Sequence, residues 1–192
     1  MKHVKNTSKR TRLVAGGAVA AALVAGTVGA VSAQASPAAP AAAGGAAAAP
    51  KAEAKSEGLV SSAHLGTDAA VKAAQGALKA AEKANQHVSV AVVDRNGNTL
   101  VTLRGDGAGP QSYEAAEKKA FTAVSWNAPT SELTKRLESA PTLKDIPGTL
   151  FLAGGAPVDA KGAPVAGIGV AGAPSGDLDE KFAQAGAATL AE

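Results

Sequence analysis

The chain has 192 residues, of which 46% are hydrophobic and 18% are charged, and it contains no cysteine. This length accommodates one domain of ordinary size together with flanking segments. Because there are no thiols, disulfide bonds and a thiol-based redox switch are excluded. The formal net charge is +3, but the positions of the cations change what that charge means.

Five of the cations lie in the first dozen residues, and a stretch rich in Ala, Val, Leu and Gly follows at residues 13–31. Small residues around Gln34 then offer cleavage sites. This order is typical of a secretory signal peptide. We therefore predict that residues 1–35 are cleaved, and that the mature protein is secreted, extracellular and not membrane-spanning. Lys9-Arg10 replaces the arginine pair of a twin-arginine signal, so both export routes remain open.

Without the signal peptide the chain carries 14 basic and 16 acidic residues, a net charge of −2. That charge gives no electrostatic support to nucleic-acid binding, so no nucleic-acid partner is expected. Residues 36–57 contain small residues, Pro, Lys and Glu but no large apolar side chain. Such a segment cannot bury enough apolar surface to offset the entropy of ordering. We predict a disordered linker there, followed by one folded domain at residues 58–192.

The folded domain begins with a predicted amphipathic helix that Thr67 caps. Apolar residues recur at helical spacing on its inward face, and Lys, Gln and Glu lie on its outward face. The inward residues are Ala70, Val71, Ala74, Leu78 and Ala81.

A β-hairpin follows the first helix. Residues 87–94 and 99–103 are rich in Val, Leu and Thr, and they flank the sequence Arg95-Asn96-Gly97-Asn98. Asn-Gly between two such runs is a strong hairpin signal, because both residues tolerate the positive φ angles of the turn.

Further along, the pattern predicts two helices, then two strands around a turn at residues 159–162, and a last helix that Ser175 or Asp177 caps. The predicted ranges are 112–127 and 130–140 for the helices, 149–152 and 163–171 for the strands, and up to 190 for the last helix. Hairpins of this kind favour an antiparallel sheet packed against helices, since parallel strands need a helical crossover. The expected class is α+β, with mixed α/β layers.

Five segments, taken in order, resemble the GlcG/HbpS-like haem-binding family and in particular its secreted actinobacterial branch. They are VAVVDRNG (90–97), EAAEKKA (114–120), NAPTS (127–131), GGAPV (154–158) and VAGIGV (165–170). The resemblance implies a profilin-like fold that assembles into homo-oligomers, octamers in the secreted branch. It also implies binding of haem b and iron, and an accessory role beside the ectodomain of a sensor histidine kinase in redox or haem sensing.

Haem iron needs at least one axial ligand, usually His, Met, Cys or Tyr. The mature chain has neither Cys nor Met, so residue type leaves His64, His87 and Tyr113 as the strong candidates. The resemblance implies that His64 is the haem-associated histidine. It also implies that Thr149 contacts the haem iron, a role that residue type alone would not assign, because Thr is an ordinary strand residue.

Glu114 and Glu117 stand three residues apart on a predicted helix, so their carboxylates lie on neighbouring surface and can share a cation. The resemblance implies an iron site there. The simpler reading is a solvated acidic pair, because Glu114 also faces Lys118 at a spacing of four residues.

Two functional classes remain. The first is a secreted haem and iron binder that acts as an accessory sensor, with weak haem-degrading or peroxidase-like turnover as an open possibility. The second is a GlcG-like accessory protein or enzyme that acts on a small organic ligand. The predicted export, and the lack of an evident acid–base pair, favour the first class, with a binding or sensor role rather than an enzymatic one.

Overall fold

The structure is a computed structural model that describes residues 52–191 of the chain. The predicted signal peptide at residues 1–35 and most of the predicted linker lie outside these residues. The last part of that linker, residues 52–57, is exposed, and a single turn of 3-10 helix, η1 (Ser56–Gly58), begins in it. No helix in the described part of the chain is long and apolar enough to cross a bilayer.

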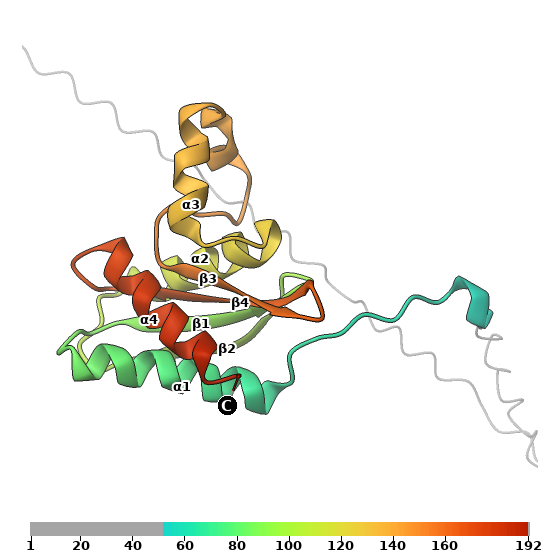
Figure 1. Cartoon of the computed structure of the whole chain (residues 1–192), viewed down its shortest axis with the longest axis horizontal. Helices are drawn as coiled ribbons and strands as arrows, with labels where there is room; N and C mark the ends of the chain where they lie inside the picture. Colours follow the sequence, from blue (N-terminus) through green and yellow to red (C-terminus); the bar gives the residue numbers. More distant parts are fainter. Residues whose placement is uncertain (1–51, 192) are drawn as a thin grey trace, which may run out of the picture. The chain divides into compact units, whose positions relative to one another are not determined.

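Four antiparallel strands form one sheet in the order β2-β1-β4-β3 (Figure 1). This arrangement confirms the predicted α+β class with an antiparallel sheet. The strands are β1 (Ser89–Asp94), β2 (Thr99–Arg104), β3 (Gly155–Ala160) and β4 (Ala163–Ala171).

Helices cover both faces of the sheet (Figure 1). Helices α1 (Thr67–Lys83) and α4 (Gly176–Ala188) pack on one face, and α2 (Ser112–Trp126) packs on the other. Side chains of successive strand residues point to opposite faces. Accordingly, Val90 and Val92 of β1 belong to the core under α1 and α4, whereas Ala91 and Val93 belong to the core under α2.

Helix α2 lies unusually close to β4 because both elements lack bulk where they meet. A Cβ atom at Gly169 would overlap the carbonyl oxygen of Ala116, and one at Gly167 would overlap that of Ala120. The helix therefore rests its backbone almost directly on the strand. The glycines that alternate along β4, and not large side chains, therefore set the distance between α2 and the sheet.

The predicted strand at residues 149–152 is wrong. These residues form a loop, and the strand that pairs with β4 begins at Gly155. Phe151 packs instead with Ala128 and Leu133, and its ring meets Trp126 edge-on with the centroids 5.2 Å apart. Burial in this small side cluster overrides the strand propensity of the segment.

Helix boundaries also differ from the predictions. Thr67 is the first helical residue and not the cap, since Gly66 occupies the N-cap position without a side-chain bond. The predicted helix at 130–140 is shorter: α3 (Thr130–Lys135) gives way to two 3-10 turns, η2 (Arg136–Glu138) and η3 (Pro141–Asp145). The predicted cap by Ser175 is confirmed, because its hydroxyl accepts a hydrogen bond from the backbone N–H of Leu178 at 3.3 Å.

Candidate functional site

The turn between β1 and β2 is organised by the carboxylate of Asp94. Its Oδ1 accepts the backbone N–H groups of Asn96 at 2.8 Å and Asn98 at 2.9 Å, and its Oδ2 accepts the side-chain amide of Asn98 at 3.1 Å. Gly97 has the positive φ of 86° that this tight turn requires. Burial alone would raise the pKa of the Asp94 carboxyl, but hydrogen bonds from Asn98 and Asn96, with the nearby His64, hold it below its ordinary value.

His64 lies beside this turn, in the segment that precedes α1. Its Nδ1 is 3.8 Å from Oδ2 of Asp94, and its Nε2 is 2.8 Å from the hydroxyl oxygen of Ser62. The imidazole is 36% exposed, whereas the Asp94 side chain is only 8% exposed. His64 therefore offers an accessible imidazole that is held against a buried carboxylate.

Phe121 on α2 connects this turn to the loop that carries Thr149. A Cβ atom built on Gly97 would lie 2.8 Å from Cε2 of the Phe121 ring, and one built on Gly148 would lie 3.5 Å from Cε1. The turn and the loop thus contact opposite edges of one aromatic ring. His64 contacts the same turn through Asp94, and Thr149 directly follows Gly148.

The loop with Thr149 is attached to α2 by a buried hydroxyl. Thr122 accepts the backbone N–H of Leu150 at 2.8 Å and donates to the carbonyl of Lys118 at 2.7 Å. The hydroxyl of Thr149 itself donates to the carbonyl of Ile146 at 2.8 Å. The loop therefore has a fixed path along the helix, and the Thr149 oxygen keeps lone pairs for a further partner.

The predicted haem residues are thus brought to the same end of the sheet, although His64 and Thr149 make no hydrogen bond to each other among the described residues. Large apolar side chains stand exposed on either side of Thr149, with Ile146 41% and Leu152 56% exposed. An imidazole, a hydroxyl, an aromatic ring and apolar side chains are the kinds of group that a haem site uses. These residue types therefore match what haem requires.

The other two strong candidates for iron ligation lie elsewhere. His87 precedes β1 at the opposite end of that strand from Asp94, and its Nδ1 is 2.7 Å from the carbonyl oxygen of Asp106. Tyr113 stands 44% exposed in the first turn of α2. Among the described residues, neither side chain makes a hydrogen bond or ion pair to the Asp94 turn or the Thr149 loop.

Glu114 and Glu117 leave α2 on neighbouring surface, as predicted, but each is already engaged. Glu114 is 71% exposed and lies 2.6 Å from the ammonium of Lys118, whose hydrogen bond and charge lower its pKa. Glu117 is half-buried and accepts the hydroxyl of Thr102 on β2 at 2.9 Å. No group of three or more His, Asp or Glu side chains able to hold a metal occurs among residues 52–191. Two carboxylates by themselves are too few to complete the coordination shell of a metal ion.

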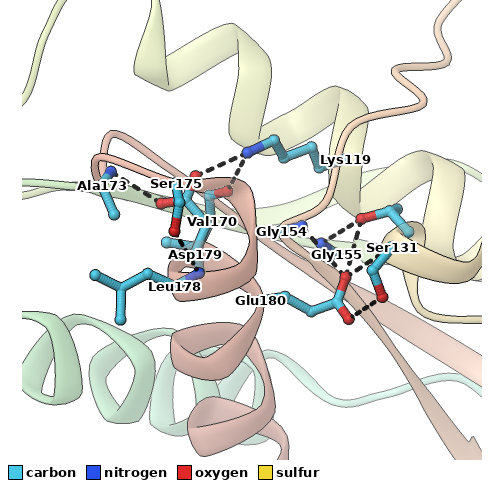
Figure 2. A network of polar contacts seen from close by, with 11 residues as sticks. Lys119, Ser131, Gly154, Gly155, Val170, Ala173, Ser175, Leu178, Asp179 and Glu180 are labelled. Carbon is cyan, nitrogen blue, oxygen red and sulfur yellow. Dashed lines mark hydrogen bonds and ion pairs between the residues drawn. The ribbon is translucent and has the colours of Figure 1, made fainter. Parts of the chain in front are cut away.

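Sequence reasoning missed a buried polar network at the start of α4 (Figure 2). Lys119 donates to Oδ2 of Asp179 at 2.9 Å and to the carbonyl of Val170 at 3.0 Å. The neighbouring Glu180 accepts the backbone N–H of Ser131 at 2.9 Å, its hydroxyl at 2.6 Å, and the N–H of Gly154 at 3.3 Å. In the sequence these residues look like ordinary surface charges, because only the fold brings α2, α3 and α4 together.

Comparison with known proteins gives a family match over the folded part of the chain. A family model described as "Haem degrading protein HbpS-like" matches residues 65–188. The matched region contains Thr149, Glu114 and Glu117, whereas His64 lies immediately before it. Among curated proteins, an uncharacterized 15.0 kDa protein of Citrobacter freundii is 33% identical over 109 residues, which cover 54% of this chain and 77% of that protein.

Solved structures agree with the family match. A double mutant of Streptomyces reticuli HbpS, in which two glutamates are replaced by aspartate, is 77% identical and aligns with a TM-score of 0.71. The alignment covers 74% of this chain and 97% of that one. The PduOC:heme complex is 26% identical with a TM-score of 0.61, over 66% of this chain and 95% of the other. The structure of that relative is a complex with haem.

Proposed function

Because the chain belongs to the HbpS-like family of haem-degrading proteins, we propose that it is a secreted protein that binds haem b and iron and serves as an accessory sensor. The observation that carries this proposal is the position of His64 and Thr149, which adjoin two segments packed on opposite edges of the Phe121 ring. When bound, haem supplies an iron centre that can change oxidation state. The proposal also includes slow degradation of bound haem, the activity for which the family is described.

Each residue of the site has an expected role toward haem. The imidazole of His64 would be the stronger ligand to the iron, and the hydroxyl of Thr149 would be a weaker ligand from the loop. The exposed side chains of Ile146 and Leu152 supply apolar contact area for the porphyrin. Of the cations that could pair with a propionate, Arg104 donates to the carbonyl of Ala108 and Lys119 is paired with Asp179. The exposed Arg95, which follows Asp94 in the turn, is therefore the preferred partner.

The iron site is proposed at Glu114 and Glu117 on the exposed surface of α2. Two carboxylates leave most of the coordination shell to water or to a neighbouring subunit. The double mutant of the Streptomyces protein replaces two glutamates that are three residues apart, the same spacing as this pair. The shared spacing supports a functional role for such a pair. We propose iron as the ion that it binds in this chain.

The partners are also part of the proposal. We expect a homo-oligomer, an octamer as in the secreted branch of the family, that contacts the ectodomain of a sensor histidine kinase. The charge pattern of residues 1–35 supports export to the same side of the membrane as such an ectodomain. Size-exclusion chromatography with light scattering measures the number of subunits directly.

A second candidate function has one observation in its favour. A cavity of about 320 Å³ opens beside Lys119 and the first residues of α4, Gly176 and Asp177. Lys119 is ion-paired with Asp179 there, and Asp177 also lines the cavity, so these polar groups suit a small polar organic ligand. In this alternative the protein is a GlcG-like accessory protein or enzyme, and haem has no specific site on it.

A haemin titration distinguishes the two candidates. The protein that begins at Ser36 is titrated with haemin and followed by visible absorption, together with the His64→Ala and Thr149→Ala variants. A saturable Soret band that either substitution alters supports the haem site. Spectra that match free haemin in all three proteins would refute it and move the weight to iron alone at Glu114 and Glu117 or to a small organic ligand. His87→Ala is the matched control, because His87 lies at the other end of β1 and should leave the spectrum unchanged.

A further inference from the structure

We propose that Asp94 is the residue that prepares His64 to bind iron: its carboxylate keeps the proton on Nδ1 of His64, and the lone pair on Nε2 is therefore left for the haem. This inference rests on the proposed function, because it assigns a positioning role within the same haem site.

The two oxygens of Asp94 are used differently. Oδ1 accepts three hydrogen bonds, from the backbone N–H groups of Asn96 and Asn98 and, at 3.3 Å, from the side-chain amide of Asn98. Within the described part of the chain, Oδ2 accepts the Asn98 amide alone, at 3.1 Å, and it is the oxygen that lies 3.8 Å from Nδ1 of His64. Oδ2 therefore keeps accepting capacity on the side that faces the imidazole.

This carboxylate is fixed, whereas the imidazole can adjust. Asp94 ends β1 and is 6% exposed, and its hydrogen bonds to the turn hold it in one position. His64 is partly exposed and lies outside any helix or strand. A shift of about 1 Å in the ring closes the 3.8 Å separation to a normal hydrogen bond. The turn thus provides an ionised acceptor that orients the side chain of His64.

The position of the proton on His64 follows from these contacts. A neutral imidazole has one N–H donor and one nitrogen acceptor. Once the ring has moved within hydrogen-bond distance of the carboxylate, which can only accept, Nδ1 is the donor and Nε2 is the acceptor. Nε2 lies 2.8 Å from the Ser62 hydroxyl, which then donates to it. Metal-binding histidines commonly have this arrangement, with a carboxylate on the nitrogen that does not bind the metal.

Two consequences are expected for bound haem. A carboxylate behind the imidazole makes the ligand more basic, which favours ferric iron over ferrous iron and lowers the reduction potential. Loss of such a partner commonly weakens metal binding by about 10- to 100-fold. The Ser62 hydroxyl competes for the same lone pair and must leave when iron binds, so its removal should not weaken binding.

The test is the Asp94→Asn variant of the whole protein. Asparagine keeps an oxygen for the N–H groups of the turn but turns an NH₂ donor toward His64, which favours the other tautomer. Nitrogen-15 NMR of the protein without haem should show the Nδ1–H tautomer of His64 in the wild type and the Nε2–H tautomer in Asp94→Asn. With haem bound, the iron–histidine stretching frequency of the ferrous protein should fall and the reduction potential should rise.

Two control variants separate the possible failures. His64→Ala should lack the iron–histidine band, and Ser62→Ala should keep the wild-type tautomer and spectrum. If the band is the same without His64, the proposed haem site is wrong. If His64 is the ligand but Asp94→Asn changes neither tautomer nor band, the role of Asp94 is refuted. An Nε2–H tautomer in the wild-type protein would refute it as well, even if Asp94→Asn fails to fold.

Discussion

The ammonium of Lys119 on α2 lies 2.9 Å from Oδ2 of Asp179 on α4, and both side chains are almost completely buried. The pair joins helices on opposite faces of the sheet, past the end of β4, where Lys119 also donates to the carbonyl of Val170 (Figure 2). Asp179 in turn accepts the backbone N–H of Ala173 at 3.0 Å. The pair therefore fixes where the chain leaves β4 and enters α4.

Replacing one member of this pair should cost much more stability than an exposed ion pair would. Lys119→Met leaves the Asp179 carboxylate buried without a cation, which typically costs about 3–5 kcal/mol. Chemical denaturation at pH 7 measures the loss in free energy of unfolding. The double variant Lys119→Met/Asp179→Leu is the control and should recover much of that loss, because no buried charge remains. Equal stabilities of the single and double variants would contradict this account.

The stability of the Lys119→Met variant should also depend on pH in a defined direction. Burial raises the pKa of Asp179 in the folded protein, although Lys119 partly offsets the effect. A raised pKa means that the folded state holds the proton more tightly, so stability is greatest below the ordinary pKa and falls as pH rises through the raised value. Without Lys119 the offset is lost, so the variant should recover stability relative to wild type as the pH is lowered from 7 to 4. A destabilisation that is constant over this range would contradict the prediction.

The buried hydroxyl of Thr122 should control the loop that carries Thr149. Thr122→Val keeps the shape of the side chain but leaves the N–H of Leu150 without its partner, at a cost of about 1–3 kcal/mol. Haemin affinity should fall as well, because the loop loses its fixed path. Thr122→Ser retains the hydroxyl and should retain haemin binding. Titration of both variants checks this prediction, which fails if Val and Ser behave alike.

Iron binding at Glu114 and Glu117 should respond in opposite directions to two changes. Glu114→Gln/Glu117→Gln removes both carboxylates and should abolish saturable binding of ferrous iron. Lys118→Gln removes the ammonium that is ion-paired with Glu114 and that repels a metal cation. Binding of ferrous iron should therefore tighten by about two- to fivefold at low salt. Isothermal titration with ferrous iron under anaerobic conditions measures both effects. Weaker binding in Lys118→Gln would argue against a site at this pair.

The two predicted helix caps should differ in importance. Ser175→Ala removes the side-chain acceptor for the N–H of Leu178 and should destabilise the protein by about 1 kcal/mol. Thr67→Ala should have almost no effect, because Thr67 lies inside α1 and makes no cap bond. Thermal unfolding of the two variants provides the comparison. A larger loss for Thr67→Ala would contradict the structure at the start of α1.

The close contact between α2 and β4 predicts strong intolerance at Gly169. In Gly169→Ala the new Cβ meets the backbone carbonyl of Ala116, which cannot move aside as a side chain can, and we expect a loss of about 3 kcal/mol or more. Gly58→Ala is the matched control, since a Cβ there meets nothing within 4 Å, and it should change stability by less than about 0.5 kcal/mol. Denaturant titrations measure both. A well-folded Gly169→Ala variant of wild-type stability would contradict the packing.

The sequence alone predicted the elements that have strong local signals. The spacing of Ala and Leu predicted α1, the Asn96-Gly97 pair predicted the first hairpin, and Ser175 predicted the start of α4. These predictions succeeded because helical periodicity, positive-φ turns and side-chain caps depend on residues that are near one another in the chain. The pattern of five ordered segments also led to the family, which the match over residues 65–188 confirmed.

Only the tertiary structure decided the features that depend on distant residues. Local propensity predicted a strand at residues 149–152. In the structure Phe151 packs against Trp126 instead, and the strand begins at Gly155. Lys119 and Asp179 are 60 positions apart in the sequence, and they become a buried pair only because α2 and α4 meet in the fold. The contact between His64 and Asp94 spans the whole of α1. Burial and long-range pairing are properties of the packed chain, and so the sequence could name the candidate site residues but not their neighbours.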